Sequence, residues 1–213
     1  MIAPQAGVAH EGKPFIFLSA FAAFLFALLD YPLPAIFFLL VCAFTVYFFR
    51  DPERVVPDGA GLAVSPADGR VIKVLTRQDP VSQEERTCIC IFMNLFNVHV
   101  NRVPVKSTVV SRIYHPGAFV NASFDKASEL NERLVWVLDS EEGERWYMVQ
   151  IAGLVARRIV ARAEVGDRLE RGERVGIIRF GSRVDLYLPA GYHPNVREGE
   201  CVFAGQTVVA KRS

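Results

Sequence analysis

The sequence predicts a mainly β protein, in which a barrel-like or sandwich-like domain follows an N-terminal membrane-associated helical hairpin. Three observations lead to this fold class. Apolar residues concentrate in two stretches before Arg50, and short runs of β-branched and aromatic residues recur after Arg54. A glycine rhythm also repeats near the C-terminus. With 213 residues, the chain has room for one domain and an appendage.

The N-terminal segment, residues 1–54, is expected to form the hairpin. Pro14–Leu29 and Ala35–Phe49 are almost wholly apolar, and Asp30–Pro34 separates them. A helix of 15 or 16 residues is about 23 Å long, shorter than a ~30 Å hydrocarbon core. The hairpin therefore either spans the bilayer or dips into it. A signal peptide does not fit, because the segment is too long and has no small-x-small cleavage site.

Basic residues at the end of the hairpin suggest its orientation. Arg50 and Arg54 favour the cytoplasmic side by the positive-inside rule. We therefore expect the remaining chain to lie on the cytoplasmic face of the cell (inner) membrane.

Residues 55–213 show little helical periodicity and are expected to form the β-rich domain. Glycine, proline and aspartate punctuate its short apolar runs, as is typical of many-stranded sheets. One short helix is expected at Asp125–Asn131. The nine candidate strands are Gly69–Leu75, Thr87–Met93, Ser107–Tyr114, Arg133–Leu138, Arg145–Ile151, Arg157–Ala161, Arg174–Arg179, Val184–Leu188 and Thr207–Ala210.

Two segments, 164–176 and 196–208, share a Gly-x4/5-Gly-x-x-Val rhythm. Together with Ser65-Pro-Ala-Asp-Gly69 before a strand, this rhythm is typical of barrel-sandwich hybrid folds such as lipoyl carriers. A carrier would need an exposed lysine at a hairpin tip, in a Met-Lys or Asp-Lys context. Lys73, Lys106, Lys126 and Lys211 do not lie in Met-Lys or Asp-Lys hairpin contexts, so only the barrel-sandwich hybrid feature is retained.

Composition excludes several functions. The net charge is +1, and no Lys/Arg block suggests a nucleic-acid partner. Cys42, Cys88, Cys90 and Cys201 lack C-x-x-C spacing and a histidine cluster, so no metal site is expected. We expect these cysteines to be buried free thiols of a reducing compartment.

Four motifs in the β-rich domain contain most of its candidate polar chemistry. Each taken alone is an ordinary turn or a structural residue. They are Val64–Gly69 with Asp68, Phe96–Pro104 with His99, Tyr114–Gly117 with His115 (followed by Asn131-Glu132-Arg133), and Arg179–Arg183 with Gly181-Ser182.

Together these motifs closely resemble the phosphatidylserine decarboxylase proenzyme family, in particular its short, membrane-associated, pyruvoyl-dependent branch. The resemblance covers the whole chain after Arg54, with the motifs in the family's order, and the hairpin suits a bilayer lipid as substrate. The matching residues are Ser-Pro-Ala-Asp68-Gly, Phe-Asn-Val-His99-Val-Asn-Arg, Tyr-His115-Pro-Gly, Asn-Glu132-Arg and Arg-Phe-Gly181-Ser182-Arg-Val-Asp-Leu-Tyr-Leu-Pro.

The resemblance implies self-cleavage between Gly181 and Ser182. The Ser182 hydroxyl attacks the Gly181 carbonyl, which is approachable because glycine has no side chain. The resulting ester eliminates to dehydroalanine, which hydrolyses to a covalent pyruvoyl group (pyruvate as cofactor) and ammonia. The products are a large chain, 1–181, and a small chain, 182–213, which would form a heterodimer and possibly a higher oligomer.

The resemblance further implies that the pyruvoyl ketone forms a Schiff base with the amine of phosphatidylserine. This imine accepts the electrons left when CO2 departs, as pyridoxal phosphate does elsewhere. The product is phosphatidylethanolamine, made without a metal or a diffusible cofactor, and the pathway is phospholipid biosynthesis.

The base for self-cleavage is where this chain departs from the larger relatives. In the family an aspartate and a histidine serve, and Asp68 and His99 match them. A second family histidine is replaced by Arg102, which cannot act as a base at neutral pH. Either His99 does both jobs with assistance from His115, which we prefer, or His115 alone supplies the triad imidazole.

Arginines are weaker candidates for contact with the lipid phosphate or carboxylate. Arg102 and Arg183 are these candidates. Two alternative functions stay open. One is archaetidylserine decarboxylase, which needs the same head-group chemistry. The other is a non-enzymatic membrane-anchored β-domain in which Gly181-Ser182 is only a turn.

Overall fold

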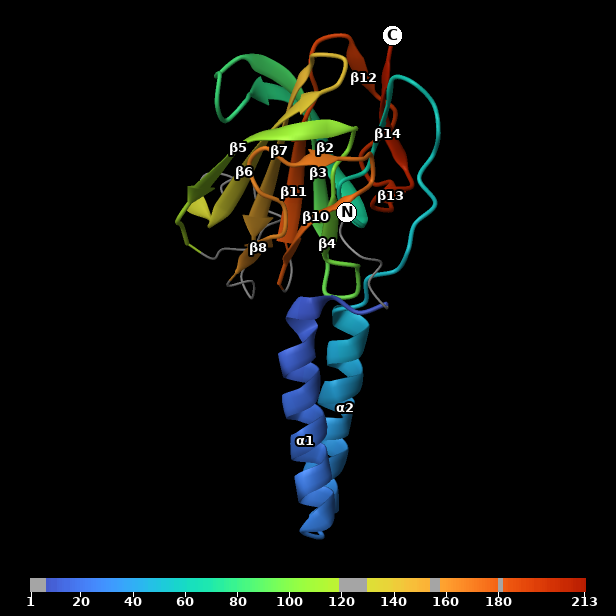
Figure 1. Cartoon of the computed structure of the whole chain (residues 1–213), viewed down its shortest axis with the longest axis vertical. Helices are drawn as coiled ribbons and strands as arrows, with labels where there is room; N and C mark the ends of the chain where they lie inside the picture. The colour runs from blue at the N-terminus through green and yellow to red at the C-terminus, as the bar shows by residue number, and fades with distance from the viewer. Residues whose placement is uncertain (1–6, 119–129, 154–157, 180–181) are drawn as a thin grey trace. The chain divides into compact units, whose positions relative to one another are not determined.

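A computed structural model describes residues 7–118, 130–153, 158–179 and 182–213. The chain divides into two compact units, Met1–Glu53 and Arg54–Ser213. Figure 1 shows the two helices of the first unit and the strands of the second.

The first unit is a pair of antiparallel helices, α1 (Lys13–Leu28) and α2 (Pro32–Phe48), preceded by the 3-10 turn η1 (His10–Gly12). Proline occurs in the first turn of each helix, where its missing N–H costs no hydrogen bond. Phe26 of α1 stacks on Phe38 of α2, with ring centroids 5.5 Å apart. The two apolar stretches thus form helices, as predicted.

The outer surface of this helix pair is apolar. Phe17 and Leu33 are 73% and 79% exposed, and most other large side chains of α1 and α2 are also exposed. The segment His10–Leu28, with 19 residues, is long and apolar enough to cross a membrane, whereas α2 is shorter. Helices that are apolar on all sides need an apolar environment.

The described residues of the second unit form three antiparallel sheets. The largest has the order β13-β2-β3-β11-β7-β6-β5-β9 and curls into a half-barrel (Figure 1). Its strands are β2 (Gly69–Gln78), β3 (Glu85–Met93), β5 (Ser107–His115), β6 (Arg133–Ser140), β7 (Arg145–Ala152), β9 (Arg168–Leu169), β11 (Ser182–Tyr187) and β13 (Cys201–Val202).

Two three-stranded sheets complete the unit. One has the order β1-β14-β12 and the other β4-β10-β8. Their strands are β1 (Leu62–Val64), β4 (Val100–Arg102), β8 (Ile159–Ala161), β10 (Arg174–Ile178), β12 (Tyr192–Pro194) and β14 (Val208–Arg212).

All nine predicted strands are present, and the mainly β fold class is confirmed. The sequence missed β1, β4, β9, β12 and β13, which have only two or three residues each. Runs this short carry no measurable period-2 pattern. The predicted helix at Asp125–Asn131 falls almost entirely outside the described residues.

The large sheet buries side chains on both of its faces, as β11 illustrates. Ser182, Val184 and Leu186 are buried on the face of the main core, with Met93 and Ala152 as cross-strand partners of Ser182. The alternate residues of β11 belong to the opposite face. That face has its own smaller cluster, formed by Cys88, Cys90, Val135, Val137, Tyr147, Val149, Ile151 and Tyr187.

The glycine rhythm of the sequence corresponds to a structural repeat. Gly166 and Gly172 flank β9, Gly199 and Gly205 flank β13, and all four have positive φ. Such backbone conformations favour glycine. The strands around them also match, because β9-β5-β6-β7 and β13-β2-β3-β11 are the two halves of the large sheet, and β4-β10-β8 mirrors β1-β14-β12.

This repeat shows how the chain reaches the start of β11. One half is the continuous run β4 to β10, and the other half is split into β1–β3 and β11–β14. In the continuous half, the equivalent strands β6 and β7 are joined by a tight turn at Ser140–Glu144. In the split half the whole second repeat is inserted between Met93, the last residue of β3, and Ser182, which pairs with it.

Candidate active site at the start of strand β11

We call the point where the second repeat is inserted, between Met93 and Ser182, the insertion junction. Ser182 lies at the end of this insertion. It is the first residue of β11 and lies between Met93 of β3 and Ala152 of β7. Its side chain is fully buried, and its Oγ has no hydrogen-bond partner among the described residues. A buried hydroxyl in this condition is costly and calls for a functional explanation. Its predicted partner, Gly181, lies outside the described residues.

A buried amide network lies on the same face of the sheet. Trp136 Nε1–H donates to Gln150 Oε1 at 2.8 Å, and Gln150 Nε2–H donates to Asn101 Oδ1 at 2.8 Å. Asn101 Nδ2 in turn lies 3.6 Å from the sulfur of Met93, the cross-strand partner of Ser182. Sequence reasoning missed this network, although an Asn and a Gln inside β-like apolar runs were a usable signal.

His99 lies immediately before β4 and is fully buried. The pairing of β4 with β10 brings it to the end of β10, where Ile178 N–H donates to the His99 carbonyl at 3.3 Å. Ile178 precedes Ser182 by only four residues. The structure therefore places His99 next to the segment that leads into Ser182.

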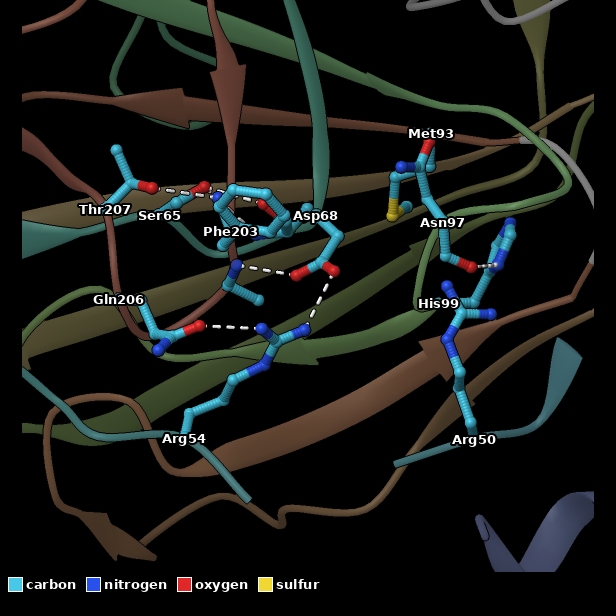
Figure 2. Close-up of polar contacts among 12 residues, drawn as sticks. Arg50, Arg54, Ser65, Asp68, Met93, Asn97, His99, Phe203, Gln206 and Thr207 are labelled. Atoms are coloured by element: carbon cyan, nitrogen blue, oxygen red, sulfur yellow. Dashed lines mark hydrogen bonds and ion pairs between the residues drawn. The ribbon is translucent and has the colours of Figure 1, made fainter. Parts of the chain in front are cut away.

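The tautomer of His99 follows from its hydrogen bond. Its Nδ1 lies 3.0 Å from the carbonyl oxygen of Asn97 (Figure 2). A carbonyl oxygen can only accept, so Nδ1 carries the proton in the neutral imidazole. The lone pair is then on Nε2, which is buried. His99 is thus held in the form that can take a proton.

Asp68 lies in the loop between β1 and β2 and is 4% exposed. Its Oδ1 accepts from the Ala204 N–H at 2.7 Å, and its Oδ2 binds Arg54 Nη2 at 2.9 Å (Figure 2). Arg54 also donates to Gln206 Oε1 at 2.6 Å. Sequence reasoning found Asp68 but used Arg54 only for orientation, since a contact across 14 residues leaves no local pattern.

Gly69 explains why the chain follows this path after Asp68. A Cβ on Gly69 would lie 2.2 Å from the carbonyl oxygen of Phe92 on β3. Any other residue would therefore push β2 away from β3.

His115 lies on the other face of the sheet. It pairs with Arg133, which pairs with Ile151, which pairs with Arg183. Directly paired residues share a face, and Arg183 points away from Ser182 because adjacent strand residues alternate. At ~4.8 Å per strand, His115 is roughly 14 Å from Arg183. The register does not bring His115 to Ser182, so the expected assistance has no geometric basis here.

The surroundings of His115 affect its charge. Partial burial lowers the pKa of His115, and the neighbouring Arg133 guanidinium lowers it further. It lines a surface pocket of about 400 Å³ together with Arg77, Asp79, Arg133 and Tyr187.

Arg183, expected as a weak substrate-binding residue, is instead fully buried on this second face. Its Nε and Nη2 bind the two oxygens of Asp185 at 2.6 and 3.0 Å, and Nη2 lies 3.0 Å from Cys90 Sγ. Arg77 also binds Asp185. Arg183 therefore serves a buried ion pair, because no lipid head group can reach it there.

The other weak candidate, Arg102, is 5% exposed. Its Nη1–H donates to the Gly172 carbonyl at 2.8 Å, and its Cδ packs against Gly205. Arg102 thus joins the two glycine turns of the repeat.

The cysteines fit their prediction only in part. Cys88 and Cys90 are fully buried, and burial raises the pKa of the Cys88 thiol well above its usual range. Cys42 is half-buried, and Cys201 is exposed on β13. Cys88, Cys90 and Asp185 bring ligand atoms within 4.8 Å of one another. The Arg183 guanidinium already supplies the positive charge at that point.

Comparison with known proteins yields one family. The sequence model described as "Phosphatidylserine decarboxylase" matches residues 41–210. A relative from Nitratidesulfovibrio vulgaris is 59% identical over 99% of this chain and 97% of its own length. A relative from Oleidesulfovibrio alaskensis is 60% identical over 96% and 94%. One from Burkholderia ambifaria is 47% identical over 98% and 97%. All three are named phosphatidylserine decarboxylase proenzyme.

Proposed function

The chain belongs to the phosphatidylserine decarboxylase family, and from this premise we propose that it is a self-cleaving decarboxylase. It cuts itself between Gly181 and Ser182 and then converts phosphatidylserine into phosphatidylethanolamine and CO2. The observation that carries the proposal is the Ser182 hydroxyl, buried at the insertion junction with no hydrogen-bond partner among the described residues. Family membership over nearly the full chain sets aside the non-enzymatic alternative.

Self-cleavage begins with proton removal from Ser182. His99 is our candidate base, because its Nδ1–H is held by the Asn97 carbonyl and its Nε2 carries the lone pair. Ser182 Oγ forms a bond to the Gly181 carbonyl carbon as the Gly181–Ser182 C–N bond breaks, which leaves an ester. Loss of the Ser182 α-proton then expels the Gly181 carboxylate and leaves dehydroalanine. Water converts this enamine to a pyruvoyl group and ammonia.

Asp68 stays our candidate carboxylate of the self-cleaving group. It binds Arg54 and accepts from the Ala204 N–H, and these contacts hold its negative charge in place near the start of β2. The Asn97 carbonyl holds the Nδ1–H of His99.

The surroundings of Ser182 fit a pyruvoyl group. During pyruvoyl formation the Ser182 Oγ leaves with the Gly181 carboxylate and Cβ becomes a methyl group, and a hydroxyl that makes no hydrogen bond within the described chain loses none in this change. The neighbouring Met93 and Ala152 are apolar and fully buried. When formed, the pyruvoyl carbonyl supplies an electron sink for the decarboxylation of an amino acid head group. Around it, Asn101 and Gln150 keep the polar wall of the site rigid, since each is hydrogen-bonded.

The apolar helix pair supports a membrane location. We propose that α1 and α2 hold the β-rich unit at the cytoplasmic face of the inner membrane, where a bilayer phospholipid is available. We also propose that chains 1–181 and 182–213 stay together as a heterodimer. The relatives' names support phosphatidylserine over an archaeal lipid as substrate.

The intact masses of the purified protein test this function. We expect two chains, of which the smaller begins at position 182 and is one ammonia lighter than a serine terminus. Ser182→Ala should stay a single chain without decarboxylase activity, because the nucleophile is lost. A wild-type protein that remains uncut yet decarboxylates would refute the proposed route, and so would cleavage of Ser182→Ala.

A further inference from the structure

The turn between β3 and β4 exposes two large apolar side chains. Leu95 is 38% exposed and Phe96 is 65% exposed. The turn lies at the outgoing end of the insertion junction, directly after Met93, the strand partner of Ser182. We refer to residues 94–97 as the apolar turn. Exposed apolar residues beside a site of chemistry are a signal for a ligand or an interface.

The apolar turn is held rigid by its own polar groups. The Asn94 N–H donates to Asn97 Oδ1 at 2.9 Å, and the Phe96 N–H donates to Asn94 Oδ1 at 2.8 Å. The Asn97 N–H donates to the Asn94 carbonyl at 3.1 Å. These bonds satisfy three backbone N–H groups of the turn without water, which lowers the cost of moving the turn towards lipid.

The turn is also free of charge. No Asp, Glu, Lys or Arg occurs between Arg86 and Arg102, so no carboxylate, ammonium or guanidinium group in this stretch opposes contact with an apolar environment. The turn is coupled to the site as well, since the Asn97 carbonyl accepts from His99 Nδ1–H at 3.0 Å (Figure 2). A contact made by Leu95 and Phe96 would therefore lie one hydrogen bond from the imidazole.

We propose that Leu95 and Phe96 enter the acyl-chain region of the bilayer and bring the site to the level of the phospholipid head groups. This inference rests on the proposed function, because a phospholipid substrate is what makes the bilayer the partner. A protein partner would be expected to form hydrogen bonds or ion pairs with polar groups around the two apolar side chains. In this turn the Asn94 and Asn97 side chains instead accept hydrogen bonds from the turn's own backbone.

Quenching by lipid tests the contact without using catalysis. The full chain carrying Phe96→Trp is reconstituted in phosphatidylcholine vesicles brominated on the acyl chains. The native Trp136 and Trp146 are fully buried, so they form a constant background. We expect the bromine atoms to quench the fluorescence added by Phe96→Trp. The matched control is Val165→Trp, at a position whose native side chain is 58% exposed, and its added fluorescence should be unaffected. Equal behaviour of the two variants would overturn the proposal.

A kinetic comparison tests the role in catalysis. Phe96→Asp should lower turnover of bilayer phosphatidylserine by about tenfold, since an anion replaces an apolar anchor. Turnover of a monomeric short-chain phosphatidylserine should be unchanged, self-cleavage should be complete, and Phe96→Leu should restore the bilayer activity. An equal loss of turnover with both substrates, or no loss with either, would contradict a bilayer contact. If the wild type neither cuts itself nor decarboxylates but Phe96→Trp is quenched, the proposed function fails and the lipid contact stands.

Discussion

At the scale of single residues, chemistry depends on which nitrogen holds a proton and which face a side chain occupies. His99 and His115 both follow strands in turn-like motifs, and the sequence left the choice between them open. The structure separates them, because His99 adjoins the end of β10 and His115 belongs to the row of Arg183 on the opposite face. Only His99 lies beside the segment that leads into Ser182.

Replacing each histidine should therefore have different effects on self-cleavage. His99→Ala should slow cleavage by about 10²–10⁴-fold, the usual contribution of a general base, whereas His115→Ala should cut at the wild-type rate. The conversion of the single chain to two chains is followed by gel electrophoresis over time. Normal cleavage in His99→Ala, with loss in His115→Ala, would return the role to His115.

The pKa of His115 provides a direct check of its surroundings. Burial and the Arg133 charge both disfavour the imidazolium, so the histidine should titrate below its ordinary value of about 6.5. The folded state then loses stability as pH falls below that ordinary value, because the unfolded chain binds the proton more readily.

Arg133→Gln should raise the pKa of His115 towards its ordinary value, while the effect of burial remains. The measurement is an NMR titration of the ring protons, assigned by the signal that disappears in His115→Gln. An unchanged pKa in Arg133→Gln would mean that Arg133 does not face the imidazole.

At the scale of the element, successive side chains of β11 point to opposite faces of the sheet, and each face has a different role. One face presents Ser182 to the main core, and the other holds Arg183 and Asp185 in a fully buried ion pair. The strand is central in the sheet and is paired along its whole length with β3 and β7. This pairing fixes the position of Ser182, and the ion pair on the reverse side depends on the same register.

Removing Arg183 should destabilise the fold and leave substrate recognition intact. Arg183→Met leaves Asp185 with Arg77 alone at a buried position, and breaking a buried pair costs about 3–5 kcal/mol. Denaturant unfolding measures this loss. The matched control is Arg145→Met, whose partner Asp139 is 37% exposed, so its effect should be below about 1 kcal/mol. An unchanged stability of Arg183→Met, with a raised KM, would restore Arg183 as a substrate-binding residue.

At the scale of the whole molecule, the proposed cut falls at the junction of the two repeats, where it would interrupt no described strand. The small chain would contain β11 to β14, and three of these pair with strands of the large chain: β11 with β3 and β7, β13 with β2, and β14 with β1, while β12 pairs with β14. Cutting before Ser182 breaks no strand of the described structure. The ladder hydrogen bonds and both cores remain in place.

The two chains should therefore stay associated after cleavage. In mild detergent we expect them to co-elute in equal amounts during size-exclusion chromatography, and to separate only in denaturant. The uncut Ser182→Ala chain serves as the reference for elution volume. Loss of the small chain under native conditions would show that β11 is not held by its neighbours.

Sequence patterns by themselves determined the helix pair, nine strands and the glycine repeat, and the motifs that resemble the family made Asp68, His99 and Ser182 the candidate site residues. These features are local, since period, turn residues and motif spacing are read from neighbouring positions. Tertiary structure alone decided that His115 and Arg183 face away from Ser182, that Arg54 binds Asp68, and that the Asn97 carbonyl sets the tautomer of His99. Strand register decides which distant residues share a face, and a shift by one residue would reverse every such assignment.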